Sequence, residues 1–478
     1  MPLLFLLVGC VQSVKVGEPP AELSLSGPSV LDPWRSGSVS FEVDARGGER
    51  LEVSAVDGAG AIQWEYQGKA EDFTWDGRDR SGRLLPLGPI TLVARLADSP
   101  AEPEASLELQ LVDLGVLTGQ LGGDRIALIW HNYGGAGRWY DGGVDRPTFG
   151  LGATHDGASP VEVPTPWDDL DRPPDPDTLT NMPAAYAWDA RPTLSLGLGP
   201  DAGGGVTPAI EGWTLVEGEV GPNALLVFQK DEALANGPDV VEPELSLEFR
   251  SSGRVVARVA VPLRIYALLG EPTFESSELP YGPWVAVIDP LLRSISGVTP
   301  DREQVTSAVV DHIYDELGLA YDTQAGASAY AFYQRFPYDD AHLDLSSFLY
   351  RRFGSIINCS DCAALVEAFS NMIGAEAYYS IITPSFDLNE IKAIGADAFT
   401  NCPFGRGGCG FSYHAVVTGS LDTEVIYDAT LVLDGDDDPG DSPSTELRVH
   451  ALYADVYLDR LVRSGRPSYR YTQSGTLQ

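Results

Sequence analysis

Three short segments of the chain together supply a thiol, an imidazole and a carboxylate. Cys359 lies in the first segment, His414 in the second and Asp428 in the third. Nucleophilic acyl chemistry needs these groups, because a base activates the thiol and an acid orients the base. The sequence therefore makes Cys359, His414 and Asp428 the candidate catalytic residues.

The residues that follow Cys359 have the pattern of a helix. Apolar side chains recur at helical spacing until Gly374 interrupts the pattern. Asn358 is a favourable N-cap, and Asp361 lies three residues further on, as in a capping box. Cys359 would then occupy the first helical position, where free backbone N–H groups and the helix dipole favour a thiolate. The alternative is that the cysteines only pack in a core, as free cysteines often do.

The other two candidate residues lie in a predicted hairpin. Residues Phe411–Thr418 and Glu424–Thr430 read as two strands around a short turn. If the turn is centred on Leu421, His414 and Asp428 face each other directly, about 5 Å apart at Cβ. The carboxylate could then hold the imidazole in one tautomer. An ordinary cross-strand charge pair on a solvated face is the alternative.

Together these segments resemble the transglutaminase-like superfamily of papain-related enzymes. The family pattern is Cys-x-Asp-x-Ala, a Leu-rich helix and a Gly, then a His that begins a strand and an Asp before a small residue and Thr. The resemblance covers residues 280–435 and implies an α+β papain-like domain. It makes Cys359 the nucleophile, His414 the base and Asp428 the orienting carboxylate. The matching residues are Cys359, Asp361, Ala363, Leu365 and Gly374, with His414-Ala-Val-Val417 and Asp428-Ala-Thr430.

A second cysteine stays open as the candidate nucleophile. Ala415 stands where the family often has an aromatic residue, and the run Asp361-Cys362-Ala-Ala-Leu-Val resembles the nucleophile turn of NlpC-type cell-wall peptidases. Those peptidases usually place a second His where this chain has Asp428, which favours the transglutaminase register. Cys362 therefore remains the alternative nucleophile. Superfamily members cross-link Gln to Lys, hydrolyse amides or have lost activity.

The N-terminus predicts export. A short apolar run leads into Leu7-Val8-Gly9-Cys10, which matches the bacterial lipobox, so Cys10 is the predicted lipidation site. No basic residue precedes the run, and a start codon further upstream would explain that. We expect a protein anchored by lipid to the bacterial outer membrane or cell surface, with residues 1–21 as signal and tether.

Cysteine spacing agrees with export. Cys402 and Cys409 lie in a loop rich in Gly and Pro, just before the His414 strand. A disulfide between them would hold this loop in place. A zinc site is less favoured, because this pair lacks two further ligands nearby.

The composition limits the partners. The chain has 478 residues and a net charge of −38, so we expect about three domains and no nucleic-acid binding. The expected partner is a protein or peptide substrate in the cell envelope, with membrane contact only through the N-terminal lipid. No cofactor is expected. Asp434, Asp436 and Asp438 alternate as in a calcium loop, but the spacing is not that of an EF-hand, and a solvated acidic turn is the preferred interpretation.

The order of patterns predicts a multidomain chain. Residues 22–115 read as an immunoglobulin-like β-sandwich, and the run Trp75-Asp-Gly-Arg-Asp79 resembles the immunoglobulin-like module of flagellar hook caps. Residues 116–272 read as a second all-β domain. Helices are expected over 284–294, 299–318 and 346–353 in the α+β domain, and residues 436–478 as an acidic loop, a packing helix over 447–461 and a loose tail.

The function expected from these patterns is a cell-envelope thiol enzyme that acts on amide bonds of proteins or peptides. The product would be an acyl-enzyme that water or an amine resolves. The alternatives are a catalytically inactive surface scaffold and an NlpC-like peptidase that uses Cys362.

Overall fold

The described part of the chain, in a computed structural model, is predominantly β-structure in several sheets. The predicted lipidation site Cys10 lies outside it, and no helix within it is long and apolar enough to cross a membrane. The structure describes residues 22–27, 30–31, 39–46, 49–57, 59–83, 85, 88–98, 103–111, 117–130, 138–140, 148–151, 161–162, 183–197, 206–219, 224–251, 254–273, 283–335, 339–404, 408–419, 425–436, 438, 443–471 and 474–477.

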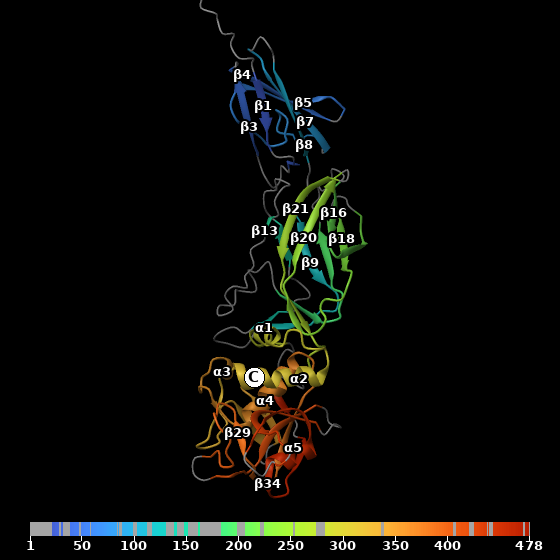
Figure 1. Cartoon of the computed structure of the whole chain (residues 1–478). Coiled ribbons are helices and arrows are strands. Elements are labelled where there is room, and N and C mark those ends of the chain that lie inside the picture. The colour runs from blue at the N-terminus through green and yellow to red at the C-terminus, as the bar shows by residue number, and fades with distance from the viewer. Residues whose placement is uncertain are drawn as a thin grey trace, which may run out of the picture.

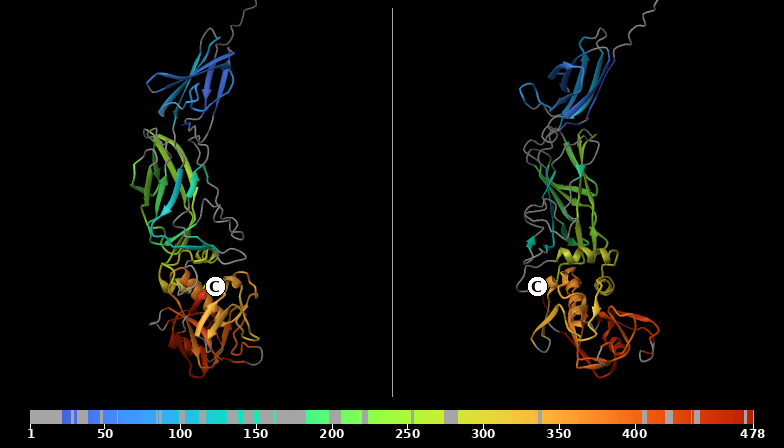
Figure 2. Two further views of the ribbon diagram at one scale, coloured as in Figure 1. Left: turned by 180° about the vertical axis from the view of Figure 1, so that it is seen from behind. Right: turned by 90° about the vertical axis from the view of Figure 1, so that its left-hand side faces the viewer.

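The molecule is elongated, and its described elements form three groups along one axis (Figure 1). We call these groups the N-terminal, middle and C-terminal tiers, with elements within residues 22–111, 117–268 and 285–477. The N-terminal strands form one end, the middle strands follow, and the C-terminal helices and strands form the other end. The two further views show the same order of tiers (Figure 2).

The N-terminal tier consists of sheets packed over a common core. Strand Arg50–Asp57 alternates between inward and outward side chains, and the inward ones are buried. The strands are β1 (Glu22–Ser26), β2 (Val30–Leu31), β3 (Val39–Arg46), β4 (Arg50–Asp57), β5 (Ile62–Lys69), β6 (Phe73–Trp75), β7 (Gly88–Leu96) and β8 (Glu104–Leu111).

The middle tier is built around one large sheet, in which β20 (Glu244–Ser251) and β21 (Arg254–Pro262) pair as an antiparallel hairpin. A smaller sheet, β14-β22-β19, lies toward the C-terminal tier. The strands are β9 (Leu117–Gly122), β10 (Leu128–Trp130), β11 (Arg138–Tyr140), β12 (Thr148–Leu151), β13 (Val161–Glu162), β14 (Ala184–Ala187), β15 (Thr193–Gly197), β16 (Val206–Ile210), β17 (Trp213–Glu217), β18 (Leu225–Lys230), β19 (Asp239–Val241), β20 (Glu244–Ser251), β21 (Arg254–Pro262) and β22 (Ile265–Leu268).

The C-terminal tier contains the helices and the strands that pack on them. Its elements are α1 (Val285–Ser294), α2 (Arg302–Asp311), η2 (His312–Glu316), β23 (Ala320–Tyr321), β24 (Ala331–Arg335), β25 (Asp339–Leu343), α3 (Leu345–Leu349), β26 (Ile356–Ile357), α4 (Cys359–Met372), β27 (Tyr378–Thr383), β28 (Phe386–Leu388), β29 (Ile391–Ala393), β30 (Gly410–Phe411), β31 (His414–Thr418), β32 (Val425–Asp434), β33 (Glu446–Tyr453), α5 (Ala454–Leu461), β34 (Val462–Ser464), β35 (Ser468–Tyr471) and β36 (Ser474–Leu477).

Helix α1 joins the middle and C-terminal tiers. The hydroxyl of Tyr266 on β22 donates to the buried carboxylate of Asp289 on α1 at 3.0 Å. Arg293 and Arg264 also pair with Asp289, at 3.2 and 3.4 Å. The side chains of α1 belong to the same apolar core as those of α4. The helix therefore couples the smaller middle sheet to the C-terminal core.

Helix α4 is the central element of the C-terminal tier. Every one of its side chains is buried, as expected for a helix enclosed on all sides. It packs against β31 and β32, in the antiparallel sheet of order β29-β32-β31-β27-β35. The helix that begins with Cys359 therefore lies against the two strands that carry His414 and Asp428.

Two predicted helices differ from the observed ones. The helix expected over 299–318 begins only after its N-cap Asp301, whose carboxylate accepts the backbone N–H groups of Glu303 and Gln304. The helix predicted over 346–353 is only the short α3, which ends when the chain turns back toward β26.

The prediction for residues 436–478 was also wrong in two places. The first half of the predicted helix over 447–461 is strand β33, because it pairs with β32, and this tertiary contact overrides helix propensity. Helix α5 follows. The tail expected to be loose includes β35, which pairs with β27 and extends the same sheet. A domain boundary at residue 435 would therefore divide one sheet.

Candidate functional site

The candidate nucleophile lies at the first position of α4. Asn358 is the N-cap, and its side chain accepts the backbone N–H of Asp361 at 3.1 Å. The Asp361 carboxylate accepts the backbone N–H of Asn358 in return, at 3.0 Å. This is the capping box that the sequence predicted. It holds the first turn of α4, and so the backbone of Cys359, in a defined position.

The Asp361 carboxylate also binds the preceding loop. It accepts the Ser328 hydroxyl at 2.7 Å and the backbone N–H groups of Ala329, Tyr330 and Ala331 at 2.8, 2.7 and 2.6 Å. The side chain is fully buried. Since buried carboxylates are tolerated only when well hydrogen-bonded, this residue links the loop to the helix start. The sequence indicated its role as a cap but not this second role.

His414 and Asp428 meet inside the protein. The imidazole Nε2 lies 2.8 Å from an Asp428 carboxylate oxygen, and both side chains are buried. The sequence predicted that they face each other directly, and this register was wrong. Val417 pairs with Tyr427, so Val416 lies opposite Asp428 and His414 is its diagonal neighbour. A shift of two positions keeps both side chains on one face of the sheet.

The Asp428 carboxylate has two further donors. The Thr430 backbone N–H donates to its second oxygen at 2.7 Å. The hydroxyl of Tyr457 on α5 donates at 2.7 Å to the oxygen that His414 contacts. Tyr457 is fully buried and lies 29 residues further along the chain than Asp428. No local pattern identified it, because only the docking of α5 brings it here.

The environment of His414 favours its charged form. Burial lowers the pKa of His414, but the charge and hydrogen bond of Asp428, with the neighbouring Cys359, raise it to about 10. The Phe411 ring stacks on the imidazole with centroids 4.4 Å apart. Among the described residues Nδ1 has no hydrogen-bond partner, and Cys359 is one of the groups that raise the pKa of this imidazole. The arrangement is that of an imidazolium held between a carboxylate and a thiol.

A chain of hydroxyl groups reaches Ser360, the residue that follows Cys359 on α4. The Tyr379 hydroxyl lies 2.6 Å from that of Tyr333, which lies 3.0 Å from Ser360. Ser360 in turn lies 2.9 Å from the hydroxyl of Tyr413. Sequence reasoning missed this cluster. The available signal was that Ser360 and Tyr413 are the immediate neighbours of two candidate catalytic residues.

The structure distinguishes the candidate nucleophiles. Cys362 is fully buried, and burial, followed by the charges of Asp428 and Asp361, raises its pKa well above the ordinary value. A thiolate at Cys362 is therefore disfavoured. Cys359 instead lies beside His414, the candidate base.

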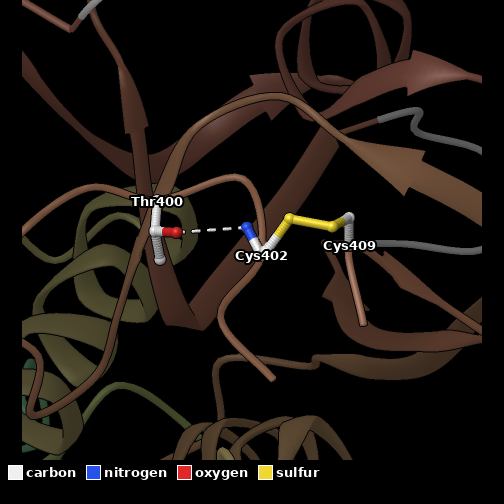
Figure 3. The surroundings of a disulfide bond; sticks show 3 residues. All are labelled: Thr400, Cys402 and Cys409. Carbon is white, nitrogen blue, oxygen red and sulfur yellow. Dashed lines mark hydrogen bonds between the residues drawn. A yellow bond between two sulfur atoms is a disulfide. The ribbon is translucent and has the colours of Figure 1, made fainter. Parts of the chain in front are cut away.

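A disulfide joins Cys402 and Cys409 before the strand that carries His414 (Figure 3). The backbone N–H of Cys402 also donates to the Thr400 hydroxyl at 3.1 Å. Strand β30 follows directly and pairs with β28. The disulfide thus closes the loop that leads to Phe411 and the imidazole.

The acidic turn after β32 has internal hydrogen-bond partners. The backbone N–H of Asp436 donates to Asp434 at 3.2 Å, and that of Asp438 donates to Asp436 at 3.0 Å. Arg460 donates to the backbone carbonyls of Asp434 and Asp436. Within the described residues, no group of His, Cys, Asp and Glu side chains has the arrangement of a metal site.

Comparison with known proteins adds little. No protein-family model and no curated protein sequence matches the chain. Among solved structures, the CARDB domain of a Pyrococcus furiosus protein in complex with di-metal ions is similar to part of it, with 13% identity and a TM-score of 0.14. The similarity covers 20% of this chain and 94% of that domain. A TM-score of this size does not indicate a shared fold.

Proposed function

We propose that the C-terminal part of the chain is a transglutaminase-like thiol enzyme that acts on amide bonds of proteins or peptides. One observation carries the proposal: His414 contacts Asp428 through Nε2, its Nδ1 has no hydrogen-bond partner among the described residues, and its neighbour Cys359 starts a buried helix. Helix α4 packed on an antiparallel sheet supports a papain-like α+β domain for this part of the chain.

In the proposed reaction the Cys359 thiolate attacks the amide carbonyl carbon, and the carbonyl oxygen becomes an oxyanion. Backbone N–H groups in the first turn of α4 would stabilise that charge. The His414 imidazolium gives its proton to the leaving amine as the C–N bond breaks, which leaves a thioester. His414 then acts as a base toward water or an amine, and the thiolate leaves as the new acyl bond forms.

The proposal includes an envelope location. Lipidation of Cys10 would anchor the chain, and an immunoglobulin-like N-terminal unit with the second β-rich unit would hold the enzyme away from the membrane. An envelope protein or peptide would then supply the acyl group.

A surface scaffold without activity is the second candidate. The observation that favours it is the burial of Cys359, whose exposed fraction is 3%. A substrate reaches such a thiol only if neighbouring side chains move.

Thiol reactivity separates the two candidates. We would measure iodoacetamide alkylation at pH 6 by peptide mass spectrometry for the wild type, His414→Gln and Cys362→Ala. A thiolate–imidazolium pair predicts fast modification of Cys359 that is lost in His414→Gln and kept in Cys362→Ala. Slow modification in all three proteins would contradict an enzyme and leave the scaffold.

A positive result would be followed by a substrate assay. Dimethylated casein with a fluorescent primary amine tests acyl transfer, and release of ammonia or new amino termini tests hydrolysis. Cys359→Ala serves as the inactive control in both assays.

A further inference from the structure

The two free cysteines of the described chain share one turn of α4. Cys359 and Cys362 occupy its first and fourth positions, in the run Cys-Ser-Asp-Cys. Residues three apart on a helix have Cβ atoms about 5–6 Å apart, and a disulfide needs about 3.5–4.5 Å. Cβ atoms tilt toward the helix N-terminus, so the Cys362 side chain leans back toward Cys359. Rotation about χ1 can turn the two sulfurs toward each other, and a slight adjustment of the backbone in the first turn would bring the Cβ atoms within range.

The surroundings give the two sulfurs different roles. Cys359 adjoins the His414 imidazole, which lies between it and the Asp428 carboxylate in the proposed triad. Cys362 is kept as a thiol by burial and by the nearby carboxylates of Asp428 and Asp361. A reactive cysteine with a second, resolving cysteine beside it is the arrangement in which oxidation ends in a disulfide.

The chain also contains a disulfide elsewhere in the same tier, between Cys402 and Cys409. Such bonds form and persist in oxidising compartments. A nucleophilic thiol in that environment meets oxidants throughout the life of the protein, and without a resolving thiol it proceeds to irreversible sulfinic acid.

We infer that Cys359 and Cys362 form a redox-active dithiol that closes reversibly to a disulfide. Its role in controlling catalysis rests on the proposed function, whereas the disulfide chemistry itself does not. In the closed form the sulfur that would attack an amide is bonded to Cys362, so the protein is inactive until a reductant reopens the bond.

The reaction balances with hydrogen peroxide as oxidant. The Cys359 thiolate attacks one peroxide oxygen, the O–O bond breaks, and the products are a sulfenic acid and hydroxide. The Cys362 sulfur then attacks the sulfenic sulfur, its proton leaves with the hydroxyl group as water, and the disulfide forms. Two thiols are oxidised by two electrons and one peroxide is reduced.

The test is peptide mapping of the full chain after treatment with hydrogen peroxide, with and without later dithiothreitol. For the wild type we expect a peptide that has lost two hydrogen atoms, with Cys359 linked to Cys362, and alkylation at least about tenfold slower until dithiothreitol restores it. The matched variant Cys362→Ser should gain two or three oxygen atoms at Cys359, and dithiothreitol should not reverse this change.

The inference fails if the wild-type map shows no peptide that links Cys359 to Cys362 and Cys359 gains oxygen instead. The wild-type map alone decides this, so a poorly folded variant does not prevent the test. A linked peptide in a protein that never cleaves or transfers an amide would keep the dithiol and refute the proposed function. An active amide enzyme without the linked peptide would refute the dithiol alone.

Discussion

Replacing Asp361 by Asn tests whether one buried carboxylate holds the helix start against the loop before it. The carboxylate accepts five hydrogen bonds at 2.6 to 3.0 Å, three on one oxygen and two on the other. An amide keeps one accepting oxygen and turns an NH₂ group toward the remaining donors. At least two donors therefore lose their acceptor. A hydrogen bond to a charged group contributes about 1.5–3 kcal/mol, so the expected loss of stability is about 3–6 kcal/mol.

The assay needs a local readout, because a chain of several tiers does not unfold in one step. Hydrogen exchange by mass spectrometry should show faster exchange in the loop at 328–331 and in the first turn of α4. The matched control is Asp301→Asn, because Asp301 caps α2 at an exposed position. Hydrogen exchange in the first turn of α2 should change little in this variant, since Asn and Asp cap helices about equally well. Equal exchange in the two variants would refute the reasoning.

Other predictions concern the rest of the site. The folded-state pKa of His414, about 10 against an ordinary 6.5, means that its proton stabilises the fold fully below pH 6.5 and that this contribution is lost as the pH rises to 10. Urea midpoints of a Cys359→Ser protein should fall across this window, and adding His414→Gln should flatten the curve. Tyr457→Phe removes a hydrogen-bond donor to Asp428. We expect the free energy of unfolding to fall by about 1–3 kcal/mol and the pKa of His414 to rise in an NMR titration. Unchanged values of both would contradict this role of Tyr457. Replacing both cysteines of the disulfide by Ser should lower the stability of the C-terminal tier by about 2–3 kcal/mol in thermal unfolding, and an unchanged transition would show that the loop is held by other contacts.

Local hydrogen bonds explain what the sequence predicted well. The capping box of Asn358 and Asp361 spans three residues, so its partners are visible in the sequence and the start of α4 follows from them. The β-structure expected over residues 22–115 also rests on short-range patterns, such as the alternation of inward and outward side chains along β4. The assignment of 447–453 to a helix failed because strand pairing with β32 is a contact between distant residues.

The same difference between short-range patterns and long-range contacts applies to the candidate site. The sequence by itself determined which residues carry the thiol, imidazole and carboxylate, and it determined the turn of helix on which Cys359 lies. Only the tertiary structure decided the diagonal register of His414 and Asp428, the donation from Tyr457 and the attachment of the loop at 328–331 to Asp361. These hydrogen bonds join residues from 14 to 33 positions apart. Packing of the sheet on α4 brings them together, and the exclusion of water strengthens the interactions that set the charge of the imidazole.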